Sequence, residues 1–330
     1  MKYLFDIVHP ADVLTFYYPI RHLLDNDHDV VICARDKDII ISLLIELKLS
    51  FKVISKANNG SIFSAFMEII VRDFKILMHC LKKKPDIIVG FPGISASHIG
   101  KLLGIKTIGF YDTEEAKLQN KISYPFLTEL HVPKYYSGIT PKNAATFNSV
   151  KELSYFHPKQ FQKKQVNIEK PYAVIRLVDW RANHDWGKEG ISEKNIHDVI
   201  TSLEKDYGFA VTLISERNLS DSLNHLKWSG SVIQLHQHIA NAALFIGEST
   251  TMAMEATLMK IPNILITGDY RGFLSAIADC PFHIKRKDYE IKQLQKDIEH
   301  VVNADIEQWH NEFIASHDDM CDYIVEQVVS

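Results

Sequence analysis

Short apolar runs alternate along the chain with longer stretches in which apolar positions recur at helical spacing. The short runs predict buried strands, and the longer stretches predict amphipathic helices. Such an alternation of strand and helix is typical of a parallel sheet covered by helices. In the first half of the chain the predicted strands are 3–8, 29–34, 51–54, 86–90 and 106–110. The predicted helices are one that ends near 24, then 36–48, 61–83 and 95–103.

The pattern weakens over 133–170 and resumes at Tyr172, which is typical of a domain junction. A chain of 330 residues is also too long for one typical core. We therefore expect two doubly wound, Rossmann-type domains, 1–165 and 166–304, and a C-terminal helix in 305–330 that crosses back to the first domain. The second domain has predicted strands 172–178, 210–215 and 232–235, helices 192–207, 221–227 and 288–303, and a strand, turn, helix and strand over 244–267; the last helix runs from about 305 to 328.

Polar residues follow several predicted strands of the first domain. Right-handed crossovers place all strand-to-helix loops at one edge of a parallel sheet, where ligands bind. His9 could there deprotonate an acceptor hydroxyl as a neutral imidazole, or it could be hydrogen-bonded to its own loop. Asp112 and Glu114 could share acid–base work or bind sugar hydroxyls, or they could be solvated residues at a helix start. These three residues are the candidate catalytic groups of the first domain.

Three hydroxyl residues, Ser249, Thr250 and Thr251, stand where the turn in 244–267 meets its helix. The unpaired N–H groups and positive dipole end of a helix N-terminus favour a phosphate group. Glu255 lies one helical turn further on the same face, and its carboxylate is suited to accept hydrogen bonds from a ribose diol. Together these residues predict a binding site for a nucleoside diphosphate.

Residues 249–251 could instead only cap the helix. A capping box requires Glu or Gln three residues after the cap, but Met252, Ala253 and Met254 occupy those positions. Glu255 is out of register for that role. We therefore expect its carboxylate to be available to a ligand.

The segment 247–251, followed by Glu255-Ala256 and Ile261-Pro262, resembles the donor-site segment of GT-B proteins. UDP-N-acetylglucosamine 2-epimerases have a similar Ser-to-Glu spacing. With FDIVHPA at 5–11, YDTEEA at 111–116 and the loop 180–185, most of the chain resembles an uncharacterised GT-B-like family related to those epimerases. The resemblance implies that a nucleotide-sugar is bound by Gly247, Ser249, Thr250, Thr251 and Glu255.

The sequence departs from these relatives at three places. Lys260 stands where relatives tend to have Gly, and Thr250-Thr251 replaces the Gly-Gly of the epimerases. Near Gly90, where epimerases keep an Asp, the chain reads 91-Phe-Pro-Gly-93. Because 2-epimerisation needs acid–base groups on both faces of the sugar, this last departure favours glycosyl transfer.

A polar and aromatic loop, 179–186, follows the first strand of the second domain and is expected at the mouth of an interdomain cleft. Arg176, Arg181 or His184 could stabilise a leaving diphosphate, a role that GT-B enzymes fill without a metal ion. A cation bound by the acidic and histidine side chains of this loop is the alternative, and their crowded spacing argues against it. Tyr270 and Arg271 could contact base or phosphate, or the arginine could form a surface salt bridge.

Composition and missing motifs exclude several classes. The net charge of −4 gives no reason to expect nucleic-acid binding. No G-x-G-x-x-G motif follows the first strand and no P-loop motif occurs, which argues against dinucleotide dehydrogenases and P-loop kinases. The four cysteines are scattered, so we expect no metal site, no disulfide and a reducing compartment. With neither a signal peptide nor a long apolar run, we expect a cytoplasmic protein.

The apolar helix 62–81 contains Arg72 and Lys75 and is followed by 82-Lys-Lys-Lys-84. Two interpretations remain open. The helix could lie on the inner face of an anionic plasma membrane, near a lipid-linked acceptor, or it could present a solvated face.

The sequence as a whole predicts a metal-independent GT-B-type glycosyltransferase without a cofactor. It would move a sugar from a nucleotide-sugar, such as a UDP-sugar, to a glycan or lipid-linked acceptor in surface polysaccharide synthesis. A nucleotide-sugar 2-epimerase and a non-catalytic nucleotide-sugar-binding protein are the alternatives. Residue spacing does not specify the base, the sugar, the acceptor, the anomeric outcome or the oligomeric state.

Overall fold

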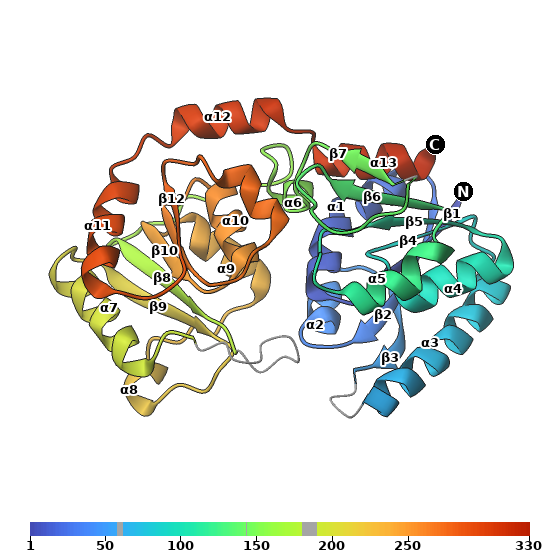
Figure 1. Ribbon diagram of the computed structural model, residues 1–330, viewed down its shortest axis with the longest axis horizontal. Coiled ribbons are helices and arrows are strands. Elements are labelled where there is room, and N and C mark those ends of the chain that lie inside the picture. Colours follow the sequence, from blue (N-terminus) through green and yellow to red (C-terminus); the bar gives the residue numbers. More distant parts are fainter. Residues whose placement is uncertain (58–61, 143, 180–189) are drawn as a thin grey trace. The chain divides into compact units, whose positions relative to one another are not determined.

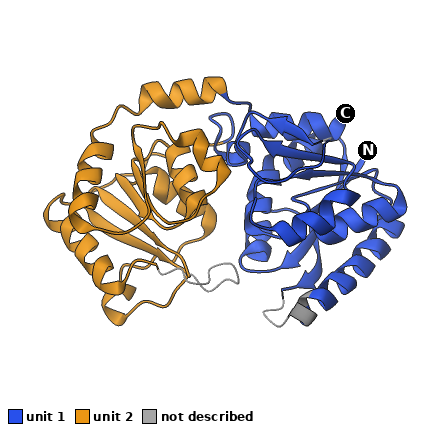
Figure 2. Ribbon diagram, viewed as in Figure 1, with its two compact units in different colours: residues 1–160, 317–330 blue, residues 161–316 orange. Residues whose placement is uncertain are grey.

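Figure 1 traces the chain in the computed structural model, which describes residues 1–57, 62–142, 144–179 and 190–330. The chain divides into two units (Figure 2). Unit 1 consists of residues 1–160 and 317–330, and unit 2 consists of residues 161–316. The chain thus leaves unit 1 at Gln160 and returns to it at His317.

Unit 1 is built on seven parallel strands in the order β3-β2-β1-β4-β5-β6-β7. The parallel sheet predicted from the alternating pattern is confirmed. The strand order reverses between β1 and β4, where the chain crosses from one side of the sheet to the other. The strands are β1 (Lys2–Ile7), β2 (Asp29–Asp36), β3 (Phe51–Lys56), β4 (Ile87–Gly90), β5 (Lys106–Phe110), β6 (Glu129–Pro133) and β7 (Ala145–Phe147).

Two groups of helices pack against the sheet of unit 1. One contains α1, α6 and α13, which contact one another, and the other contains α3, α4 and α5 (Figure 1). Leu4, Ile76 and Ile88 belong to the buried core beneath α3. The helices are α1 (Pro10–Asp25), α2 (Ile40–Glu46), α3 (Ile62–Lys83), α4 (Ile94–Leu103), α5 (Lys117–Ser123), the 3₁₀ turn η1 (Tyr124–Phe126), α6 (Leu153–Phe156) and α13 (Met320–Val329).

Strands β6 and β7 extend the first sheet beyond the predicted elements. In β7 only Phe147 is buried, whereas Ala145 and Thr146 are exposed. β6 ends at Pro133, the residue from which the sequence pattern weakens. In both strands the run of apolar residues is too short for the hydrophobic pattern alone to identify a strand.

Unit 2 contains five parallel strands in the order β12-β11-β10-β8-β9. The strands are β8 (Tyr172–Leu177), β9 (Ala210–Ser215), β10 (Leu244–Gly247), β11 (Asn263–Ile266) and β12 (His283–Arg286). After β9 the chain crosses to the other side of β8 to form β10. The carboxyl ends of β8 and β10 therefore flank the topological switch point, the position at which open α/β sheets bind ligands.

The helices of unit 2 are α7 (Glu193–Lys205), α8 (Asp221–Asn224), α9 (Val232–Ala240), α10 (Thr250–Leu258), the 3₁₀ helix η2 (Gly272–Ile277), α11 (Ile291–Val302) and α12 (Glu307–Ser316). The predicted strand 232–235 is wrong, because these residues form the first turn of α9. Ser231 caps this helix, and its side chain and that of Gln234 form a reciprocal capping box. The capping box outweighed a short apolar run that was equally compatible with a strand.

The single C-terminal helix predicted from about 305 to 328 is also wrong. The chain forms α12 in unit 2 and then a separate α13 in unit 1. Asp319 starts the second helix, because its side chain accepts hydrogen bonds from the N–H groups of Cys321 and Asp322. None of the described helices is long and apolar enough to cross a membrane.

Candidate functional site

The segment from β10 to β11 has the predicted order of strand, turn, helix and strand. Ser249 is the N-cap of α10, and its hydroxyl accepts a hydrogen bond from Met252 N–H at 3.4 Å. Thr250 and Thr251 form the first turn and are half-buried. The other N–H groups of this turn and the hydroxyls beside them provide the donors that a phosphate requires.

Gly247 allows a close approach between β10 and the neighbouring strand. It lies opposite Arg176 on β8, and a Cβ at residue 247 would stand 2.8 Å from Arg176 Cβ. The same atom would stand 2.9 Å from the ring of Phe245. A side chain at this position would therefore displace Arg176, so the glycine sets where that guanidinium lies.

Two half-buried arginines lie at the carboxyl ends of β8 and β9. Arg176 forms an ion pair with Glu216, and Arg217 Nη2 lies 3.5 Å from Glu248 Oε2. Within the described part of the chain, the buried Nε of each arginine has no hydrogen-bond acceptor. Buried donors without acceptors are uncommon in proteins, and an anionic ligand would satisfy them. Arg217 was not predicted from the sequence, because it follows a strand without a recognisable motif.

Glu248, between Gly247 and the N-cap of α10, was also not singled out from the sequence. Its buried carboxylate accepts hydrogen bonds from Val178 N–H at 2.8 Å and from Ile191 N–H at 2.5 Å. These two N–H groups lie on either side of the segment that follows β8. Glu248 therefore fixes the carboxyl end of β8 and the approach to α7 against the first turn of α10.

Glu255 is buried on α10, and its Oε2 lies 3.9 Å from Nε2 of His236 on α9. Burial lowers the pKa of His236 to about 4, so the ring is neutral near pH 7 and the contact is not an ion pair. The expectation of an uncommitted, accessible carboxylate is corrected, because Glu255 is packed against α9. The histidine was not foreseen because the residues directly before it, 232–235, had been interpreted as a strand.

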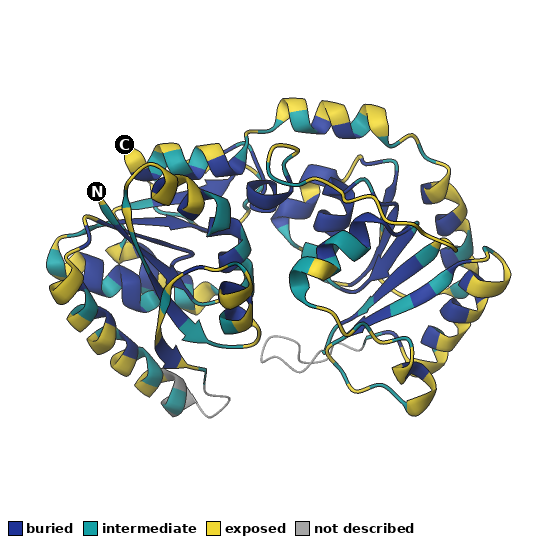
Figure 3. Cartoon of the chain, turned by 180° about the vertical axis from the view of Figure 1, so that it is seen from behind, coloured by how far each residue is buried: buried dark blue, intermediate teal, exposed yellow. Residues whose placement is uncertain are grey.

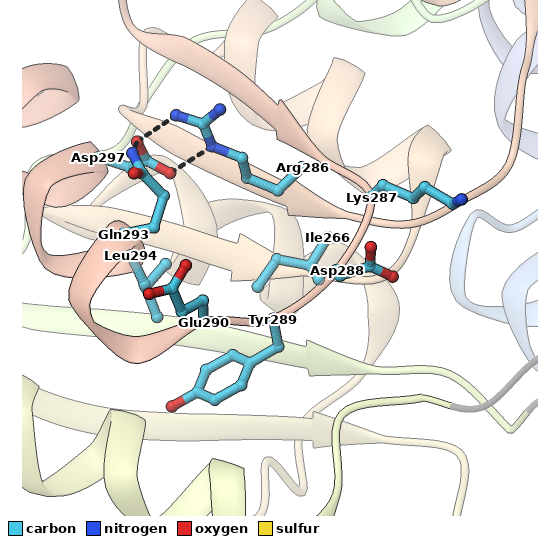
Figure 4. Close-up of a pocket in the computed structure, with 9 residues that line it drawn as sticks. All are labelled: Ile266, Arg286, Lys287, Asp288, Tyr289, Glu290, Gln293, Leu294 and Asp297. Carbon is cyan, nitrogen blue, oxygen red and sulfur yellow. Dashed lines mark hydrogen bonds and ion pairs between the residues drawn. The ribbon is translucent and has the colours of Figure 1, made fainter.

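A pocket of about 240 Å³ lies at the same edge of the sheet, beyond β11 and β12 (Figure 4). Arg286 lies on its wall, where Nε and Nη2 donate to the Asp297 carboxylate at 2.7 and 2.6 Å. Tyr270, in the loop after β11, is exposed, and Arg271, the N-cap residue of η2, is half-buried. Neither is among the residues that line this pocket.

Two predicted residues of the loop after β8, Arg181 and His184, lie outside the described residues. The structure therefore places Arg176, Gly247, Ser249, Thr250, Thr251 and Glu255 along one edge of the sheet of unit 2, together with Arg217, Glu248 and His236.

His9 is exposed and forms the N-cap of α1 in unit 1. Its Nδ1 accepts a hydrogen bond from Ala11 N–H at 3.3 Å, and Asp12 accepts one from His9 N–H at 2.8 Å. The hydrogen bond to its own loop, foreseen as an alternative, is therefore present. The surrounding protein reduces the solvation of the ring although part of the residue stays exposed, and together with the positive charges of Lys37 and Lys151 this lowers the pKa of His9 to about 4. The imidazole is thus neutral, and the capping bond places its proton on Nε2.

Asp112 is buried at the carboxyl end of β5 and forms an ion pair with Lys151, so it is not a solvated residue. Lys151 Nζ also lies 3.1 Å from Oε1 of the fully buried Glu152. Although burial alone would lower it, the two carboxylates hold the pKa of Lys151 above its usual value. Burial raises the pKa of Glu152. This cluster of two carboxylates and one ammonium group is a candidate acid–base site, because the pKa values of Lys151 and Glu152 are shifted.

Glu114 lies apart from the ion pair of Asp112 with Lys151. It is half-buried, and its Oε1 accepts a long hydrogen bond of 3.4 Å from Ser137 N–H. Lys151 and Glu152 were not predicted because they lie within the weakly patterned stretch that was interpreted as a domain junction.

Solved structures share this fold. The UDP-GlcNAc 2-epimerase from Methanocaldococcus jannaschii is similar over 100% of this chain and 99% of that chain, with a TM-score of 0.73 and 18% identity. The UDP-GlcNAc 2-epimerase from Neisseria meningitidis, bound to UDP-GlcNAc, is similar over 100% of both chains, with a TM-score of 0.70 and 11% identity. A spinosyn forosaminyltransferase is similar over 100% of this chain and 99% of that chain, with a TM-score of 0.64 and 12% identity.

No family model and no curated protein match the chain. The structural likeness nevertheless confirms the predicted fold. The chain has two parallel-sheet α/β units and a GT-B-like fold, which it shares with UDP-GlcNAc 2-epimerases and glycosyltransferases.

Proposed function

We propose that the chain is a nucleotide-sugar-dependent glycosyltransferase that binds its donor at the N-terminus of α10. The observation that carries the proposal is the pair of half-buried arginines, Arg176 and Arg217, whose Nε atoms have no acceptor in the described structure. Both lie next to Gly247 and Glu248, which lead into the first turn of α10. A diphosphate would satisfy these donors together with those of the helix N-terminus.

In the proposed reaction, an acceptor hydroxyl oxygen attacks the anomeric carbon of the bound sugar. The bond from that carbon to the diphosphate oxygen breaks, and the nucleoside diphosphate leaves with the bonding electrons. Arg176, Arg217 and the dipole of α10 would stabilise the charge that develops on the leaving oxygen. No metal ion is needed in this scheme, because fixed positive groups take its role.

The proton of the acceptor hydroxyl would pass to a group of unit 1. His9 is the first candidate, because a neutral imidazole can accept a proton at pH 7. With its Nδ1 engaged by Ala11 N–H, His9 must exchange its ring proton before Nε2 can act as a base. Asp112, oriented by Lys151, would bind sugar hydroxyls or accept the proton instead.

Nucleotide-sugar 2-epimerisation is the second candidate function. It is favoured by the likeness to UDP-GlcNAc 2-epimerases and by the two carboxylates, Asp112 and Glu152, around Lys151. Against it, the turn after β4 reads 91-Phe-Pro-Gly-93, and these buried residues carry no acid–base group.

A thermal-shift screen with UDP-, GDP-, TDP- and CMP-sugars tests the donor class, because a ligand that binds only the folded state raises the Tm. We expect one nucleotide class to do so. The selected donor is then incubated with and without candidate acceptors. Release of nucleoside diphosphate that depends on the acceptor supports transfer, whereas a changed sugar without acceptor supports epimerisation. The proposed function fails if no nucleotide-sugar binds, and binding without either reaction would indicate a binding protein.

A further inference from the structure

The helix α3 packs on unit 1 through one face only. Arg72, Ile76 and Cys80 are buried on that face, and Arg72 forms an ion pair with the buried Asp6 of β1. The sequence had suggested Arg72 as a cation of the outer surface, and its burial corrects that expectation. The charge of Arg72 is paired inside unit 1 and takes no part in the exposed surface.

The opposite face of α3 is exposed and apolar. Among the described residues from 66 to 81, every exposed position except Lys75 has a large apolar side chain. Figure 3 shows this side of the helix, next to the grey segment, as a run of exposed and half-buried residues. We call it the outer face of α3, and it consists of Phe66, Met67, Ile70, Val71, Phe74, Met78 and Leu81.

A solvated helix would have polar residues at these positions. The spacing from residue 67 through 70, 74, 78 and 81 instead follows one helical stripe, along which side chains of successive turns are adjacent. Phe74, in the middle of the stripe, is 63% exposed. Contiguous exposed apolar surface of this kind marks a site of interaction.

Positive charge borders the outer face. Lys75, Lys82 and Lys83 are exposed on α3, and Lys84 follows directly. The acidic residues of α3 are engaged elsewhere, since Glu68 binds Arg35 through two hydrogen bonds of 2.7 Å and Asp73 lies 3.1 Å from His98. The lysines therefore give this surface a net positive charge.

The strand before α3 adds to this positive region. Burial and the charges of Lys83, Lys52 and Lys82 lower the pKa of His79, which shows that Lys52 of β3 shares the electrostatic environment of the end of α3. A surface of apolar side chains bordered by lysines is suited to a bilayer interface. The apolar side chains can enter the boundary of the acyl chains, and the lysines can bind anionic headgroups.

We propose that the outer face of α3 docks unit 1 on an anionic lipid membrane, with the helix lying along the surface. Charge favours this occupant over a second copy of the chain, because a twofold contact would bring two positively charged surfaces together. The inference does not depend on the proposed reaction, because vesicle binding requires neither donor nor acceptor.

Flotation of the full chain tests the proposal with vesicles of phosphatidylcholine alone and of phosphatidylcholine mixed with phosphatidylglycerol. The wild type should float with the anionic vesicles, and added salt should reduce its binding. Phe74→Glu with Met78→Glu should abolish binding. The matched control is Leu118→Glu with Ile139→Glu, two residues of unit 1 that are also exposed but lie outside α3, and it should bind like the wild type.

A second variant leaves the apolar stripe intact, so that a folding defect cannot explain its behaviour. Lys75→Gln with Lys82→Gln and Lys83→Gln should weaken binding to anionic vesicles by roughly tenfold to hundredfold, from the loss of three interfacial lysines. The proposal is overturned if the wild type does not prefer anionic vesicles or if either α3 variant binds like the wild type. A dimer interface is the other outcome that overturns it. In that case the wild type does not bind vesicles, sedimentation shows a dimer, and Phe74→Glu with Met78→Glu converts this dimer to a monomer.

Discussion

His9 combines a structural contact with an exposed imidazole at the sheet edge of unit 1. Its Nδ1 caps α1 and its pKa is lowered to about 4, so the ring is neutral and is a hydrogen-bond donor at Nε2. A substitution of His9 therefore changes both the helix cap and any proton transfer by the ring. A control variant that keeps the cap is needed to distinguish the two effects.

Replacing His9 by Ala should lower turnover by about two to four orders of magnitude while donor affinity stays nearly unchanged, because the ring is assigned to proton transfer. The same change should cost about 1 kcal/mol of stability through the lost cap. His9→Asn is the matched control, since asparagine is a good N-cap but cannot transfer a proton. Steady-state kinetics of both variants decide the role: normal turnover of His9→Asn would assign His9 to capping alone.

His236 offers a pH-dependent test of the packing around Glu255. Its pKa is about 4 in the folded chain and 6.5 when exposed, because burial disfavours the charged ring. The folded state then binds fewer protons than the unfolded state between these values, so stability is complete above pH 6.5 and falls as the pH decreases towards 4.

Relative to His236→Gln, the wild type should lose about 1.4 kcal/mol of unfolding free energy per pH unit within that window. All four tryptophans, at 180, 186, 228 and 309, belong to unit 2, so tryptophan fluorescence reports its unfolding selectively. Urea titrations at several pH values measure the difference. Parallel stability curves for the two proteins would show that His236 is not buried as described.

At the scale of secondary structure, the N-terminus of α10 is held in place by the residue that precedes its cap. Glu248 accepts hydrogen bonds from Val178 and Ile191, which belong to the flanks of two other elements, β8 and α7. One carboxylate therefore connects three elements at the switch point. Its removal leaves two backbone donors without an acceptor.

Glu248→Ala should lower the unfolding free energy of unit 2 by about 2–3 kcal/mol, at the lower end of the cost of two unsatisfied donors. Glu216→Ala is the control, because its carboxylate is half exposed and its ion pair with Arg176 should contribute less than about 1 kcal/mol. Urea unfolding followed by tryptophan fluorescence compares the two. Equal losses would refute a special role for Glu248.

Local pattern predicted most elements, and its failures have identifiable causes. The apolar run at 232–235 is too short for its periodicity to distinguish a strand from one helical turn. The capping box of Ser231 and Gln234 favours the helix. The break between α12 and α13 depends on Asp319, whose capping interactions end one apolar pattern and begin another. Both failures are cases in which one polar side chain outweighed a hydrophobic pattern.

For the whole molecule, strand–helix alternation was sufficient to predict two parallel-sheet units and the segment 244–267. It could not predict which polar residues meet across elements. Lys151 and Asp112 are far apart in sequence, as are Glu248 and Arg217, and nothing in local spacing signals either contact. The sequence therefore predicted the sheet edge at which the candidate site is placed, and the structure was needed to find the other residues that lie there.

The central claim is that the N-terminus of α10 binds the diphosphate of a nucleotide together with Arg176 and Arg217. Two variants separate these contacts. Arg217→Gln removes one of the two arginines, whereas Ser249→Gly with Thr250→Val removes the hydroxyls and keeps a residue tolerated at an N-cap.

Calorimetry with the nucleoside diphosphate chosen by the thermal-shift screen, and with its nucleoside, tests this claim most directly. Arg217→Gln should weaken the diphosphate by about 1.5–3 kcal/mol, roughly tenfold to a hundredfold in Kd, and should leave the nucleoside nearly unaffected. The hydroxyl variant should weaken the diphosphate far more than the nucleoside. Circular dichroism must show both variants folded. If both variants bind the diphosphate as tightly as the wild type, the donor site does not lie on α10.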